Sequence, residues 1–188
     1  QKFPLSETNR TDNPLSFYAA TKKSNEIMAH SYSYIYKLPC TGVRFFTVYG
    51  PFGRPDMALF KFTKNIIKNN PIELYNHGNH FRDFTYVDDI VDGIYSLIKK
   101  QPKKNIPYEI YNIGNGTPNK LLDYLKYIEI YLKKSSKIKR LPLQTGDIVK
   151  THSNINKLRK YTGYSPKINI NIGINKFIEW YKDYYKIN

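Results

Sequence analysis

The feature that most constrains the fold is a regular alternation between short apolar runs and longer amphipathic segments. Residues 42–48 (GVRFFTV) are β-branched or aromatic at most positions, and they follow a segment with helical spacing over residues 14–37 that Pro39 ends. A short apolar run of this kind predicts a buried strand, whereas the longer segment predicts a helix. Strands that alternate with helices favour a sheet with both faces covered. The expected fold class is therefore α/β.

The remaining elements are predicted in the same way, from apolar periodicity and from turn residues. We expect strands over residues 42–48, 72–75, 82–87, 109–113 and 138–143. We expect helices over residues 14–37, 57–68, 88–100, 121–133, 154–161 and 173–184. With 188 residues, no internal repeat and no long linker, the chain suits one domain or one and a half.

The charge of the chain admits two interpretations. Thirty Lys and Arg against fifteen Asp and Glu give a formal net charge of +15, which is typical of proteins that bind nucleic acid or an anionic substrate. However, 24 of the basic residues are Lys and only six are Arg, and Lys has A/T-rich codons, so a biased genome also explains the excess. We favour a solvated basic surface and keep a basic nucleic-acid binder as the non-enzyme alternative, which predicts a clustered basic face.

Other residue types exclude several classes of protein. The longest apolar runs are only a few residues, far short of the ~20 that cross a bilayer, so no membrane partner is expected. A single cysteine, Cys40, excludes an internal disulfide framework and a cysteine-built zinc site. His30, His77, His80 and His152 have no metal-ligand spacing, so we interpret them as structural or surface residues and expect no metal. No secretory signal is visible, and we expect a cytoplasmic protein.

One glycine-rich turn is spaced like a dinucleotide-binding loop. Residues 114–119 (GNGTPN) follow a predicted strand and precede a predicted helix, as a GxGxxG loop does. However, Asn119 occupies the third glycine position, and Pro118 lacks the N–H that would face a phosphate. No acidic residue ends a strand about twenty residues later, because Glu129 falls inside a predicted helix. We therefore expect a plain strand-to-helix loop.

Tyr18 and Lys22 stand four residues apart on the first predicted helix, so their side chains meet on one face. A buried Tyr beside a Lys is a candidate general acid or base, because the ammonium group favours the phenolate form. With 18 Tyr and 24 Lys the spacing alone is weak, and it recurs at Tyr95 and Lys99 near the end of another predicted helix. We expect the second pair to reach solvent. Whether Tyr18 and Lys22 are a catalytic pair has to be judged from the surrounding sequence.

The sequence around Tyr18 resembles the catalytic helix of the extended short-chain dehydrogenases that act on nucleotide sugars. The resemblance begins with residues 16–26 (SFYAATKKSNE). It continues, in the family's order, through RFFTVYGPFGRPDMALFKFTK, RDFTYVDDIVDGI, YNIGN, LPLQTGD and TGYSP. These motifs cover nearly the whole chain and are most similar to those of UDP-glucuronate 4-epimerases, mainly through GRPDMALFKFTK.

The resemblance implies a Rossmann-like parallel sheet with a smaller α/β substrate-binding lobe. A full member of the family has an N-terminal half with a glycine-rich loop and an acidic residue for the adenosine ribose, and the sequence contains neither. We therefore expect an incomplete sheet, its C-terminal half, that is inactive on its own. By the same resemblance, residues 1–50 and 82–115 belong to the NAD-binding domain, and residues 51–81 and 116–188 form the nucleotide-sugar-binding lobe.

The resemblance also implies a reaction. The expected activity is NAD-dependent epimerisation at C4 of a UDP-sugar, converting UDP-glucuronate to UDP-galacturonate through a 4-keto intermediate. Tyr18 would take the proton of the sugar 4-hydroxyl, while Lys22 would favour the phenolate and hold the nicotinamide ribose, so both would contact NAD. Three alternatives stay open: a nucleotide-sugar 4,6-dehydratase, a UDP-glucuronate decarboxylase that uses the same pair, and an inactive truncated remnant.

Four further residues are candidates for substrate binding by the same resemblance. Arg82 corresponds to the arginine that holds the diphosphate, where a guanidinium group can bind two phosphate oxygens at once. Thr47 and Arg54 would face the sugar ring, with Arg54 near the uronate carboxylate, and Asp147 would lie near the uridine ribose. The expected partners are a UDP-sugar and, through the long catalytic helix, a second copy of the chain in a homodimer, with no nucleic acid.

Overall fold

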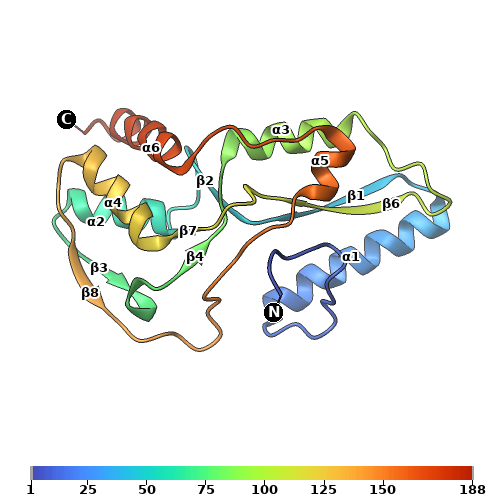
Figure 1. Cartoon of the computed structure of the whole chain (residues 1–188), viewed down its shortest axis with the longest axis horizontal. Helices are drawn as coiled ribbons and strands as arrows, with labels where there is room; N and C mark the ends of the chain where they lie inside the picture. The colour runs from blue at the N-terminus through green and yellow to red at the C-terminus, as the bar shows by residue number, and fades with distance from the viewer. Residues whose placement is uncertain (1, 188) are drawn as a thin grey trace.

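The computed structural model of the chain describes residues 2–187 and shows helices packed around short strands (Figure 1). Its helices are α1 (Phe17–Tyr36), α2 (Ala58–Ile67), α3 (Val87–Ile98), α4 (Leu121–Leu132), α5 (Asn156–Thr162) and α6 (Ile170–Tyr184). Its strands are β1 (Cys40–Phe45), β2 (Thr47–Tyr49), β3 (Pro71–Leu74), β4 (Phe81–Arg82), β5 (Phe84–Tyr86), β6 (Tyr108–Ile113), β7 (Asn119–Lys120) and β8 (Lys137–Arg140). The predicted α/β fold class is confirmed.

The strands pair two by two rather than in one continuous ladder. β1 pairs with β6, β2 with β5 and β3 with β8, all in parallel, while β4 pairs with β7 in antiparallel fashion. In the longest pair, Cys40 lies opposite Tyr108 and Phe45 lies opposite Ile113. Helix α1 lies on one side of this pair, and α3 and α5 lie on the other (Figure 1). The parallel pairs agree with the Rossmann-like sheet that the resemblance implied.

The strand predicted over residues 42–48 is two strands, and the prediction is corrected here. β1 ends and β2 begins on either side of Phe46, and the two strands have different partners. The backbone changes partner within one residue, because the N–H of Phe46 donates to the carbonyl of Ile113 at 3.2 Å and that of Thr47 donates to the carbonyl of Asp83 at 3.1 Å. Apolar spacing cannot reveal such a break, since both halves are equally apolar.

Helix α1 begins at Phe17, later than the position of Pro14 predicts. The hydroxyl of Ser16 accepts a hydrogen bond from the N–H of Ala19 at 3.1 Å and so satisfies one of the free amides of the first turn. A capping serine therefore sets the start of the helix. At the other end Lys37 adopts a left-handed conformation with φ of 55°, after which the chain turns into β1.

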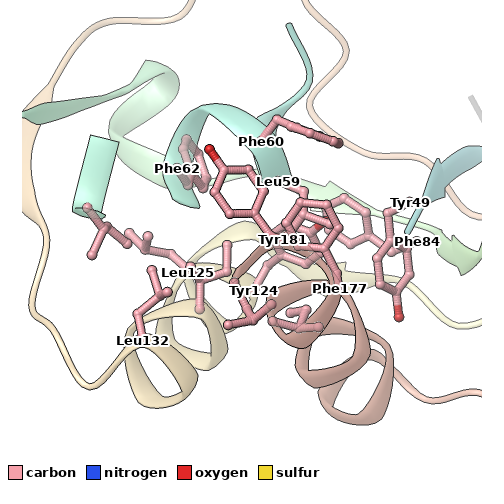
Figure 2. Packing of buried hydrophobic residues seen from close by; sticks show 14 of the residues in the cluster. Tyr49, Leu59, Phe60, Phe62, Phe84, Tyr124, Leu125, Leu132, Phe177 and Tyr181 are labelled. Carbon is pink, nitrogen blue, oxygen red and sulfur yellow. The ribbon is translucent and has the colours of Figure 1, made fainter. Parts of the chain in front are cut away.

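Two groups of buried apolar side chains hold the elements together. The larger lies among α2, α4, α6, β2, β3 and β5, and Figure 2 shows several of its aromatic rings packed between the helices. The rings of Phe84 and Tyr124 stack there with their centroids 4.2 Å apart. Gly173 lets α6 approach Tyr49, because a Cβ atom at this position would lie 2.2 Å from the phenol oxygen. The smaller group joins α3, α5 and β6.

Helix α1 is tied to β1 by one ion pair and leaves its outer side uncovered. The carboxylate of Glu26 accepts two hydrogen bonds from the guanidinium of Arg44, at 2.6 and 2.8 Å. These hydrogen bonds lower the pKa of Glu26 and raise that of Arg44. The outer side carries exposed apolar residues such as Ile27 and Met28.

Candidate functional site

Tyr18 and Lys22 lie on one face of α1, as their spacing predicts. The Nζ atom of Lys22 is 5.3 Å from the centre of the Tyr18 ring. Tyr18 is 70% exposed. The reason is that α1 is buried at Ser33, near its other end, and not at its first turn. An accessible phenol beside an ammonium group can exchange a proton with a bound ligand.

The second pair with the same spacing has the same geometry in another setting. The Nζ atom of Lys99 lies 4.1 Å from the centre of the Tyr95 ring, and Tyr95 is exposed on α3. This agrees with the prediction that the pair reaches solvent. Proximity of a lysine to a tyrosine therefore does not identify a catalytic pair. The pockets that each tyrosine lines are the better evidence.

A pocket of about 650 Å³ joins Tyr18 to the loop after β2. Its walls include Tyr18, Thr47 and Arg54, three residues that the sequence analysis singled out. Gly50 begins this loop with φ of 145°, and a Cβ atom there would lie 2.7 Å from the side chain of Val87, so the turn requires glycine. The turn thereby brings Arg54 to the same pocket as Tyr18.

Two further pockets adjoin the first and complete a row. One, of about 550 Å³, shares Thr47 with it and contains Arg82 and Asp147. The other, of about 560 Å³, shares Tyr18 with it and contains Lys22. The structure therefore brings the six predicted site residues into adjoining pockets. Their order is Lys22 and Tyr18, then Thr47 and Arg54, then Arg82 and Asp147.

The guanidinium group of Arg82 is partly buried and is held by three acceptors. Its Nη2 donates to Oδ1 of Asp147 at 3.1 Å, and its Nη1 donates to the carbonyls of Val149 and Phe81 at 3.1 and 3.3 Å. Burial lowers the pKa of Arg82, and the charge of Asp147 opposes this. A fixed guanidinium with little water around it is well suited to bind phosphate oxygens.

The guanidinium group of Arg54 already binds a carboxylate within the chain. Its Nε and Nη2 atoms lie 3.1 and 2.5 Å from the two carboxylate oxygens of Asp56. These hydrogen bonds raise the pKa of Arg54 and lower that of Asp56. Both side chains are exposed, so the pair contributes little to stability. The orientation of Arg54 thus suits a carboxylate, and Asp56 is an internal competitor for it.

Sequence analysis missed a buried carboxylate next to Arg82. Asp83 stands between β4 and β5 with no exposed surface. Its Oδ1 accepts the N–H of Asn115 at 2.7 Å, and its Oδ2 accepts the N–H of Gly116 at 3.1 Å. Oδ2 also accepts the N–H and the hydroxyl of Ser153, at 2.8 and 2.6 Å. The signal that could have revealed it is an acidic residue inside a run predicted as a buried strand, which also splits that strand in two.

This carboxylate decides the role of the glycine-rich turn over residues 114–119. Two amide groups of the turn that could have faced a phosphate donate to Asp83 instead. The turn connects β6 to β7 and α4, as the sequence analysis expected of a plain loop. This turn therefore does not fit the pyrophosphate of NAD.

Two of the four histidines have structural surroundings. His30 packs edge-on against the ring of Tyr108, and the Nε2 atom of His152 lies 3.1 Å from the carbonyl oxygen of Gly116. Among residues 2–187, no group of three or more His, Cys, Asp or Glu is arranged to hold a metal ion. The helices of the same range include none with the length and apolar character needed to cross a membrane.

The family of the chain follows from comparison with known proteins. Residues 1–114 match the NAD dependent epimerase/dehydratase family, and the chain belongs to this family. It is 50% identical to protein CapI of Staphylococcus aureus over 197 residues, which cover 97% of this chain and 59% of that protein. It is 43% identical to UDP-glucuronate 4-epimerase 1 of Arabidopsis thaliana over 201 residues, which cover 100% of this chain and 47% of that protein.

Solved structures give the same assignment. The UDP-glucuronic acid 4-epimerase of Bacillus cereus, in complex with UDP-glucuronic acid and NAD, is similar with a TM-score of 0.90 and 32% identity. The match covers 98% of this chain and 58% of that one. The chain thus spans about half to three fifths of the length of the relatives it matches.

Proposed function

We propose that this chain forms the nucleotide-sugar-binding and proton-transfer part of an NAD-dependent UDP-glucuronate 4-epimerase. The observation that carries the proposal is the row of adjoining pockets. Along the row stand a tyrosine with its lysine, an arginine that binds a carboxylate, and a partly buried arginine. A UDP-uronate offers a hydroxyl group, a carboxylate and a diphosphate in the same order. The activities named for the Arabidopsis and Bacillus relatives support this assignment.

In this proposal Tyr18 exchanges the proton of the sugar 4-hydroxyl group. Its phenolate oxygen takes the proton when C4 is oxidised and returns it when C4 is reduced on the opposite face, so one residue serves both halves of the reaction. Lys22 stabilises the phenolate by its positive charge. NAD, when bound, supplies the hydride acceptor for C4. The exposure of Tyr18 gives the sugar direct access to the phenol oxygen.

The other site residues hold the two ends of the substrate. Arg82 binds the diphosphate, because its guanidinium group is fixed and partly dehydrated. Asp147 accepts a hydrogen bond from a ribose hydroxyl in the same pocket. Arg54 leaves Asp56 and binds the uronate carboxylate, an exchange of one carboxylate for another that keeps its charge paired. Thr47, which lies in both pockets, contacts the sugar between the two ends.

The assignment of Arg54 can be tested by the selectivity of binding. Calorimetry compares the dissociation constants of UDP-glucuronate and UDP-glucose for the 188-residue chain and for Arg54→Leu. The substitution removes a hydrogen bond between charged groups, so it should weaken UDP-glucuronate binding by about 10–150-fold. UDP-glucose, which has no carboxylate, should bind almost unchanged.

The matched control is Arg10→Leu, which removes an exposed arginine from the N-terminal segment and should alter neither constant. Equal losses for both sugars in Arg54→Leu would show that this residue holds the diphosphate or the loop. The uronate assignment would then be refuted, while a nucleotide-sugar site would stand.

Several expectations stay predictions. They are the homodimer through α1, the cytoplasmic location, the division into two lobes and the inactivity of the chain alone.

The dehydratase and decarboxylase alternatives differ from an epimerase in their products, which chromatography of the reacted nucleotide sugar separates. Binding to nucleic acid that weakens steeply with salt would favour the non-enzyme alternative.

A further inference from the structure

His80 is a buried histidine to which the proposed reaction gives no role. Its side chain is 4% exposed and lines the same pocket as Arg82. Its Nε2 atom lies 3.0 Å from Oδ2 of Asp147, but the two groups are not aligned, so among the described residues this nitrogen has no hydrogen-bond partner. A buried polar atom without a partner is rare and costs free energy. A small rotation of either side chain would pair His80 with Asp147.

Asp147 therefore lies between two basic groups. Its Oδ1 accepts a hydrogen bond from Arg82 at 3.1 Å, and its Oδ2 faces His80 at 3.0 Å. With a neutral His80, the negative charge of Asp147 is balanced by Arg82 alone, and the carboxylate both holds the guanidinium and repels an anion. With a protonated His80, the three groups carry a net positive charge, and Asp147 has a second cation to bind.

Two hydrogen bonds fix the backbone of His80, so its ring stays within reach of Asp147. Its N–H donates to the carbonyl of Gly78 at 2.8 Å, and its carbonyl accepts the N–H of Leu121 at 2.9 Å. The two contacts tie the residue to the turn after β3 and to the start of α4. The ring is thus presented to the pocket by two elements that also line it.

We propose that His80 is a positioning residue for the diphosphate: when protonated it binds Asp147, and Arg82 is then free to bind phosphate oxygens. This inference rests on the assignment of the pocket to a nucleotide sugar. Histidine is the side chain that changes charge between about pH 5 and 8. Affinity for a nucleoside diphosphate sugar should therefore fall as the pH rises through that range.

Other charged and titratable side chains face the same pocket. Asp56 comes from the loop before α2, Lys61 from α2, Glu73 from β3, and Tyr75 from the turn that follows. Carboxyl groups ordinarily titrate near pH 4, and ammonium and phenol groups near pH 10, outside the range in which histidine changes charge. A dependence of binding on pH between 5.5 and 8 is therefore a readout of histidine.

The test uses UDP-glucose as the probe and calorimetry of the whole chain between pH 5.5 and 8. Both phosphates of this sugar nucleotide are esterified and keep their charge, whereas a terminal phosphate would itself titrate near pH 6. The wild-type dissociation constant should rise by about tenfold across the range, which is the low end for one charged hydrogen bond. His80→Gln should bind with no such slope. The matched control His77→Gln, an exposed histidine on the preceding turn, should keep the wild-type slope.

Asp147→Asn provides a second variant that does not depend on replacing the buried ring. It removes the carboxylate through which His80 acts, so the slope with pH should disappear whatever the absolute affinity. A wild-type slope in either variant overturns the role of His80 and leaves the nucleotide-sugar site intact. No binding of UDP-glucose by the wild-type chain at any pH overturns the site and this inference together.

Discussion

Replacing Asp83 by Asn should show how much one buried carboxylate contributes to the structure around the site. The two side chains have nearly the same shape, but the amide puts an NH₂ group in place of one accepting oxygen. Oδ2 accepts from the N–H of Gly116 and from both the N–H and the hydroxyl of Ser153, and Oδ1 accepts from the N–H of Asn115. In either orientation, the NH₂ group therefore faces at least one donor.

The magnitude follows from the more favourable orientation, in which the NH₂ group faces Asn115. One hydrogen bond to a charged group is lost, which is worth about 1.5–3 kcal/mol, and the unpaired buried donors cost about 1–3 kcal/mol more. We therefore expect the free energy of unfolding to fall by about 2.5–6 kcal/mol. At about 2–4 °C for each kcal/mol in a chain of this size, the Tm should fall by about 5–24 °C.

Urea unfolding followed by circular dichroism measures this loss, and hydrogen exchange locates it. The amide of Asn115, which faces the new NH₂ group in the favoured orientation, should lose protection in Asp83→Asn. The matched control is Asp92→Asn, whose nearest cation, Lys167, lies 3.6 Å away in an exposed pair, so its effect should stay within about 0–1 kcal/mol. A loss of less than about 1 kcal/mol for Asp83→Asn, no more than an exposed pair contributes, would refute the reasoning.

Three further changes test other parts of the molecule. Glu26→Gln should destabilise the chain at neutral pH, and its difference from wild type in urea unfolding should shrink in acid. The reason is that the folded pKa of Glu26 lies below the ordinary 4.5, so the carboxylate stabilises the fold above pH 4.5 and loses this contribution as the pH falls through the folded pKa. A difference independent of pH would contradict this. Gly173→Ala should lower the free energy of unfolding by about 1–3 kcal/mol through overpacking against the phenol oxygen of Tyr49, and Tyr49→Phe in the same chain should restore part of the loss. Tyr18→Phe should lower UDP-glucuronate epimerisation by about 10²–10⁴-fold in an enzyme completed with the other half of the sheet, with binding retained; near-normal turnover would exclude Tyr18 as the base.

The types and approximate positions of most elements could be predicted because each reflects a local pattern. The helix predicted over residues 57–68 is observed at Ala58–Ile67, and that predicted over residues 121–133 is observed at Leu121–Leu132. In both, the spacing of apolar residues alone specifies which side is buried. No knowledge of the packing partner is needed for that.

The partners of each strand and the polar contacts could not be predicted, since they join residues far apart in sequence. The change of partner at Phe46 depends on β5 and β6, which lie well beyond it in the sequence. The site residues came from resemblance, and spacing could not separate Tyr18 from Tyr95. Nothing local indicated that Asp83 binds the turn after β6.

The contacts of Asp83 also set an order of events during synthesis of the chain. Two of the five hydrogen bonds to its carboxylate come from Ser153, which follows it by 70 residues. At about 5–20 residues per second, the ribosome adds that stretch in about 4–14 s. Until Ser153 has been added, the carboxylate of Asp83 lacks two of its donors and cannot be fully paired within the chain, so the pocket around Arg82 closes only when the segment around Ser153 arrives.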